Sequence, residues 1–67
     1  MNAQIKVTMN LSSEFLVKHG NDLPIYGLTR ENGSTRFTGP LHRWQSLAED
    51  INSKRLRMLV DEAAKRA

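Results

Sequence analysis

The chain has 67 residues, of which 39% are hydrophobic and 25% are charged, and its formal net charge is +3 at pH 7. A chain of this length forms at most one domain with a small core, and this composition excludes wholesale disorder. The absence of cysteine excludes a disulfide framework and a thiolate metal site, and it fits a reducing cytoplasm. No apolar run approaches the roughly 18 residues of a membrane span, so we expect a cytoplasmic protein with no membrane partner.

The first segment, residues 5–17, alternates between apolar and polar side chains. Period two is typical of a strand with one buried face, and we favour a strand that continues to Val17, either bent or folded back near residues 10–13. The alternative for residues 12–19 is a helix that Ser12 or Ser13 caps and Gly20 ends. The residues on the apolar side of this alternation are Ile5, Val7, Met9, Leu11, Phe15 and Val17.

A β-hairpin is predicted over residues 25–39. Residues 19–24 are dense in turn formers, and Asn32-Gly33 is the preferred pair for a type I′ turn because both residues tolerate a positive φ. A two-residue loop places Thr29 opposite Arg36 and Leu28 opposite Phe37. The apolar face of the hairpin is then buried, and Arg36 points to solvent.

The C-terminal segment has a helical pattern. Pro40 suits the first turn of a helix, and residues 41–67 contain neither glycine nor proline. Two apolar stripes run along it, out of phase by roughly a quarter turn at ~100° per residue. The helix therefore bends around the sheet or breaks near Asn52-Ser53, and we favour a continuous helix. The stripes are Leu41, Trp44, Leu47, Ala48 and Ile51, and then Leu56, Leu59, Val60 and Ala63.

Together these elements predict an α+β fold: a small antiparallel sheet of three to four strands with one long C-terminal helix packed across it. We expect a single domain over residues 1–67, β-rich in 1–39 and helical in 40–67. Trp44 belongs to the first helical stripe, and we expect it to be buried against the hairpin near Leu28 and Phe37.

The residue types that catalysis needs are not grouped in this sequence. His19 and His42 are the only histidines, and no serine, carboxylate pair or glycine-rich loop accompanies them in a recognisable spacing. We therefore predict no catalytic, cofactor-binding or metal-binding residues, and we expect a protein that is not an enzyme.

The uneven charge indicates where a partner could bind. Basic and acidic residues cancel up to residue 34, whereas residues 35–67 have seven basic and four acidic residues. A basic half is typical either of a protein with an anionic partner or of a well-solvated helix. The candidate partner-binding residues are Arg36, Arg43, Lys54, Arg55 and Arg57.

A helix-turn-helix is a second interpretation of residues 47–63. Leu47, Ala48 and Ile51 would pack its first helix, Asn52 would take the left-handed turn position, and residues 54–57 would open the recognition helix. Ser53 and Asp61 depart from that pattern, because both fall where an apolar residue is usual.

The leading functional hypothesis is a small regulatory protein that binds a larger protein stoichiometrically, as an inhibitor or modulator. Lone domains of this size are common among regulators of phages and mobile elements, which is an analogy of size and not of motif. The alternative is a nucleic-acid-binding module that uses the basic C-terminal region. A homodimer through an edge strand is a third expectation.

Overall fold

The computed structural model describes residues 5–33 and 35–66. Three antiparallel strands form one sheet in the order β1-β3-β2, which confirms the α+β class. The prediction of a single long C-terminal helix is wrong, because that segment forms two helices. The elements in chain order are β1 (Lys6–Asn10), α1 (Ser13–His19), the 3-10 helix η1 (Leu23–Tyr26), β2 (Thr29–Arg30), β3 (Arg36–Pro40), α2 (Leu41–Ile51) and α3 (Lys54–Arg66).

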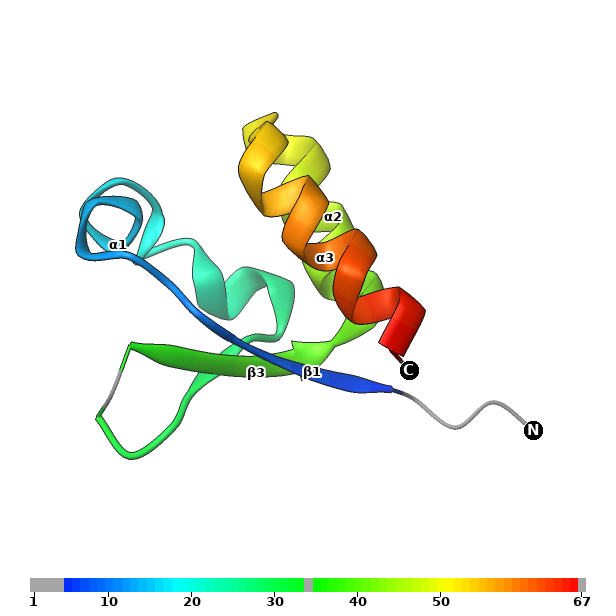
Figure 1. The fold of residues 1–67 in the computed structure, drawn as a ribbon. Helices are drawn as coiled ribbons and strands as arrows, with labels where there is room; N and C mark the ends of the chain where they lie inside the picture. Colours follow the sequence, from blue (N-terminus) through cyan, green and yellow to red (C-terminus); the bar gives the residue numbers. More distant parts are fainter. Residues whose placement is uncertain (1–4, 34, 67) are drawn as a thin grey trace.

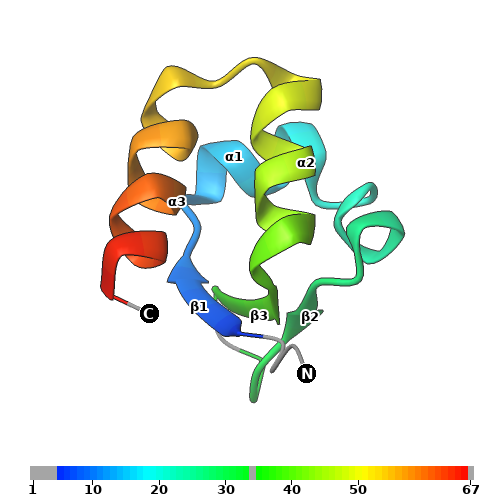
Figure 2. The same cartoon turned by 90° about the vertical axis from the view of Figure 1, so that its right-hand side faces the viewer.

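The molecule has two layers. The labelled helices α1, α2 and α3 all lie on one side of the sheet, and α2 and α3 run side by side in opposite directions (Figures 1 and 2). The other side of the sheet has no layer over it among residues 5–33 and 35–66. Thr8 and Thr38 share a hydroxyl hydrogen bond of 2.6 Å there, so this face is polar.

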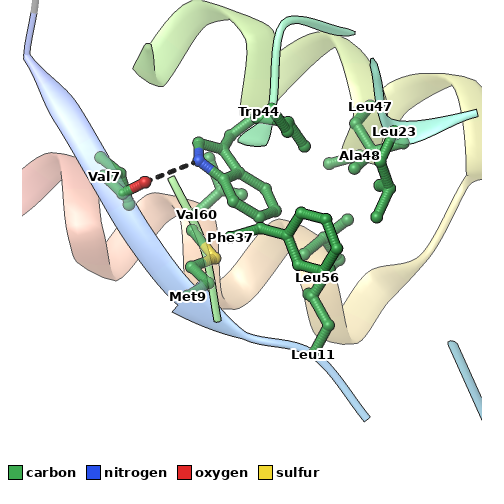
Figure 3. Packing of buried hydrophobic residues seen from close by; sticks show 11 residues of the cluster. Val7, Met9, Leu11, Leu23, Phe37, Trp44, Leu47, Ala48, Leu56 and Val60 are labelled. Atoms are coloured by element: carbon green, nitrogen blue, oxygen red, sulfur yellow. Dashed lines mark hydrogen bonds between the residues drawn. The ribbon is translucent and has the colours of Figure 1, made fainter. Parts of the chain in front are cut away.

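Trp44 is at the centre of the core, as the sequence predicts. Its side chain is 0% exposed, and its indole N–H donates a 2.9 Å hydrogen bond to the backbone carbonyl of Val7 in β1 (Figure 3). The ring of Phe37 lies beside it in the same view. A buried tryptophan removes about 150–250 Å² from water and satisfies its one polar group here. The buried residues are Val7, Met9, Leu11, Leu23, Leu28, Phe37, Trp44, Leu47, Ala48, Leu56 and Val60.

Residues 13–19 form helix α1, so the preferred strand to Val17 is wrong and the helical alternative is right. The hydroxyl of Ser12 accepts a 3.1 Å hydrogen bond from the N–H of Phe15, and the N–H of Gly20 bonds to the carbonyl of Leu16. The neighbours Phe15 and Leu16 both pack against the core, whereas Val17 is 88% exposed. That burial has a helical period, so the alternation of apolar residues past Leu11 was coincidental.

Asn32 and Gly33 have the predicted positive φ, but the hairpin has a different register. Asn32 and Gly33 have φ of 49° and 69°, as expected for this pair. However, Thr29 lies opposite Thr38, and the N–H of Glu31 bonds to the carbonyl of Arg36 at 3.0 Å. Strand pairing therefore ends at Glu31 and Arg36, so the predicted two-residue loop and the predicted Thr29–Arg36 and Leu28–Phe37 pairs are wrong.

The register error leaves the faces of the hairpin unchanged. The shift is two residues, and side chains alternate between the faces with a period of two. Leu28 and Phe37 are therefore buried, and Arg36 is exposed on the outer face, as predicted. The hydroxyl of Thr38 donates a 2.7 Å hydrogen bond to the Glu31 carboxylate, which supports the observed pairing.

The C-terminal segment breaks at Asn52, so the favoured continuous helix is wrong and the alternative break is right. Asn52 adopts a left-handed conformation with φ of 50° and ψ of 42°. The hydroxyl of Ser53 then accepts a 3.2 Å hydrogen bond from the N–H of Leu56, which caps α3. The break lets Leu56, Val60 and Ala63 of the second stripe face the same core as the first stripe, whereas Leu59 remains 42% exposed.

Candidate functional site

The predicted basic residues do not share one surface. Arg36 lies on the outer face of the sheet, and Arg43 lies on α2 with its Cγ 3.6 Å from the position that a Cβ on Gly27 would occupy. The remaining three lie in the first turn of α3, but Arg55 lines a small groove with residues of β1 and α1 whereas Arg57 lines a groove beside α2. Side chains that point in several directions do not form a single anion-binding patch.

An open hollow lies between α2 and α3, and we call it the helix groove. Its volume is about 460 Å³, and it is open to solvent. Ala48 and Val60 are only 2% and 1% exposed, so they form its floor. The lining residues are His42, Gln45, Ser46, Ala48, Glu49, Arg57, Val60 and Asp61.

The walls of the helix groove combine charges of both signs. Glu49 and Asp61 are acidic, and Arg57 is basic. The hydroxyl of Ser46 donates a 3.1 Å hydrogen bond to the backbone carbonyl of His42, so it is engaged within its own helix rather than with an imidazole. This mixture can recognise a surface that carries both charges and amides, whereas a surface for phosphates would carry fewer acids.

Met58 is an exposed residue of α3 that lies outside the groove lining. Its side chain is 59% exposed, and it lies one helical turn after Lys54 and next to Arg57 in the chain. Methionine and arginine are enriched at protein interfaces, because methionine adapts its shape to irregular partners. We define the helix-groove site as the helix groove together with Lys54 and Met58.

Neither Met58 nor the helix groove was predicted from the sequence. Met58 belongs to neither apolar stripe. An apolar residue outside the core-facing stripes was the one feature of the sequence that could have indicated an exposed binding residue. The groove itself could not be found, because it exists only once the chain breaks at Asn52 and α3 folds back beside α2.

The opposite side of α2 is tied to η1 by Tyr26. Its phenol donates a 2.6 Å hydrogen bond to the Asp50 carboxylate. That hydrogen bond raises the pKa of Tyr26 above its ordinary value of about 10, with smaller contributions from burial and from the charges of Asp50 and Asp22. This contact holds η1 against α2 and leaves the helix groove on the other side of the helix.

Within residues 5–33 and 35–66, no group of three or more His, Asp or Glu side chains could hold a metal ion. In the same part of the chain, no helix has the length and apolar character that spanning a bilayer requires. Comparison with protein-family models, curated proteins and solved structures gives no match to this chain.

Proposed function

We propose that this chain is a small, non-enzymatic regulatory protein of the cytoplasm that binds a larger protein stoichiometrically through the helix-groove site. The observation that carries the proposal is an open groove with walls of mixed charge, one of whose two helices also has an exposed methionine. A protein surface offers apolar, cationic and anionic groups together, so it can match such a site. The cysteine-free sequence supports the cytoplasmic location.

The scaffold suits this role because rigid elements position the site. The floor residues Ala48 and Val60 belong to the core, so the spacing of the groove walls is set by close packing. A preorganised surface loses little conformational freedom on binding, which leaves more of the contact energy for affinity.

A second candidate is nucleic-acid binding by the start of α3. The left-handed Asn52 followed by Lys54, Arg55 and Arg57 resembles the turn and the first residues of a recognition helix. Exposed N–H groups at a helix start also favour phosphates. However, α2 and α3 stand side by side in Figure 2, and in Figure 1 α3 lies in front of α2 along the same diagonal, whereas the two helices of that motif cross at about 90–120°. The protein-binding proposal therefore has more support.

The test compares Met58→Asp with Val17→Asp. Both positions hold exposed apolar side chains on helices, at 59% and 88% exposure, but only Met58 belongs to the helix-groove site. Each tagged variant is used to capture proteins from a lysate of the source cells, with and without nuclease. We expect a protein that is retained in a 1:1 ratio after nuclease by the wild type and by Val17→Asp, and is lost with Met58→Asp.

Two results would contradict the proposal. Capture that disappears on nuclease treatment, with an affinity that falls steeply with salt, would favour the nucleic-acid candidate. Equal retention by Met58→Asp and Val17→Asp would show that the partner binds elsewhere on the chain.

A further inference from the structure

Strand β1 has a free edge. The N–H of Leu11 bonds to the carbonyl of Thr35 at 3.0 Å, and the N–H of Leu41 bonds to the carbonyl of Ile5 at 2.9 Å. Odd-numbered residues of β1 therefore direct their backbone groups to β3. Antiparallel ladders alternate, so Lys6, Thr8 and Asn10 direct theirs away from it. Within the described residues, β3 is the only strand that pairs with β1.

This edge differs from the other edge of the sheet. Strand β2 has two residues, whereas β1 has five and is long enough to pair with another strand. An unpaired strand of this length is a template for backbone pairing. The edge of β1 is also bordered by open grooves against α3, of about 290 and 320 Å³.

We propose that β1 pairs antiparallel with β1 of a second copy of this chain, with the two-fold axis at Thr8. Thr8 then lies opposite Thr8 of the second copy, and Lys6 lies opposite Asn10. All outward N–H and C=O groups of these three residues obtain partners, and the two sheets join into one. Threonine pairs are favourable on antiparallel sheets, and this register places no like charges opposite each other.

The border of the edge is self-complementary in charge. Arg66 borders both halves of β1, whereas Glu62 borders only the half from Thr8 to Asn10. An antiparallel copy reverses this order along the strand. It therefore brings Glu62 of each copy toward Arg66 of the other, twice by symmetry.

Antiparallel pairing also brings together exposed apolar residues from opposite ends of β1. Ile5, directly before β1, is 44% exposed, and Leu59 is 42% exposed beside Met9 and Asn10 at the end of the strand. Both lie on the helix side of the sheet. Antiparallel pairing brings Leu59 of one copy toward Ile5 of the other, so apolar surface that is exposed in the single chain becomes covered.

The first test measures the mass of the full chain by sedimentation equilibrium over a concentration series. Thr8→Lys places two lysines face to face at the axis, and we expect it to raise the dimer dissociation constant by about fivefold or more. Thr29→Lys is the matched control, because Thr29 is also exposed and also hydrogen bonds to Thr38, but at the opposite edge. We expect no change in dimerisation from it, and circular dichroism checks the fold of both variants.

Two substitutions of Asn10 are expected to shift the dimer dissociation constant in opposite directions. Asn10→Glu places a carboxylate opposite Lys6 of the other copy and should tighten the dimer several-fold. Asn10→Lys places like charges opposite each other and should weaken it by a similar factor. A purely structural role of this exposed position would not produce opposite changes.

A cross-link tests the register directly. The chain has no cysteine, so Thr8→Cys introduces a single thiol. Hydrogen-bonded partners in an antiparallel pair have Cα atoms about 5.5 Å apart, within the range of a disulfide. We expect Thr8→Cys to form a disulfide-linked dimer under mild oxidation, and Thr29→Cys to remain largely unlinked.

Three results would overturn the proposal. The first is a wild-type chain that stays monomeric at every concentration up to about 1 mM. A dissociation constant of about 1 mM corresponds to an association free energy of only about 4 kcal/mol. The second is a dimer that tolerates Thr8→Lys as well as Thr29→Lys. The third is an edge that pairs only with an extended segment of another protein.

Discussion

Helices α1 and α2 differ in how the fold holds them. α1 has seven residues, none of them buried, and its Val17 is 88% exposed. α2 buries Trp44, Leu47 and Ala48, which are at most 2% exposed. Short helices are marginal in water and depend on tertiary burial for stability. The Ser12 cap and the partial burial of Phe15 and Leu16 together choose helix over strand for α1, whereas most of the buried core belongs to the sheet, α2 and α3.

The largest expected effect is at Trp44. Trp44→Ala removes a fully buried ring and leaves the carbonyl of Val7 without its indole partner, so we expect a loss of about 3–5 kcal/mol of unfolding free energy. Chemical denaturation followed by circular dichroism measures it, with Val17→Ala in α1 as the control, which should stay within about 0.5 kcal/mol. A thermal midpoint that moves by only a few degrees for Trp44→Ala would contradict the comparison.

Gly39 tests how tightly the sheet packs beneath α2. A Cβ at this buried position would meet the side chain of Leu28 and lie 3.1 Å from the carbonyl oxygen of Gly27. Both neighbours would have to shift, so we expect Gly39→Ala to cost about 1–3 kcal/mol in the same denaturation measurement. An unchanged stability would mean that the core is looser than its burial indicates.

The two serine caps provide a matched comparison of α3 with α1. Ser53 and Ser12 each accept one N–H hydrogen bond, at 3.2 and 3.1 Å. Ser53→Ala should cost about 1 kcal/mol of global stability, because α3 contributes Leu56 and Val60 to the core. Ser12→Ala should cost less, about 0.5 kcal/mol, and act mainly on the helicity of α1. Equal global effects would indicate that α1 is as integral to the core as α3.

The smallest effect is the ionisation of Tyr26. It is the sole tyrosine of the chain, so its absorbance near 295 nm reports one group, and we expect a pKa above about 10. The folded state favours the neutral phenol, so this stabilisation is present below pH ~10 and lost as the pH rises through the folded pKa. Asp50→Asn should lower the pKa toward its ordinary value. A midpoint that does not respond to Asp50→Asn would exclude the hydrogen bond as the cause.

The α+β class, the turn conformation and the burial of Trp44 could be predicted because each follows from local chemistry. The helix at residues 13–19 could not be predicted, since an alternating strand and a capped helix both fit that stretch. The packing of Phe15 and Leu16 against the core decides between them. The break at Asn52 was visible in the two out-of-phase stripes. Asparagine and serine cost only a few tenths of a kcal/mol in a helix, so their helix propensity alone did not predict a break.

The hairpin register and the site depended on distant contacts. Asn32 and Gly33 adopt their expected conformation, but strand pairing resumes at Glu31 and Arg36. The pairing of β3 with β1, which turn chemistry does not encode, contributes to that choice. The candidate basic residues were identifiable from charge alone, whereas their separation onto different faces followed from the fold.

Native-state hydrogen exchange tests the comparison of α1 with α2 most directly. Amides of α2 and the indole N–H of Trp44 should exchange only when the whole molecule unfolds, with protection that matches the denaturation free energy. Amides of α1 should exchange at least about tenfold faster through local opening, because no residue of α1 is buried. Equal protection of α1 and α2 would contradict the account, since it would mean that both helices belong to one cooperative unit.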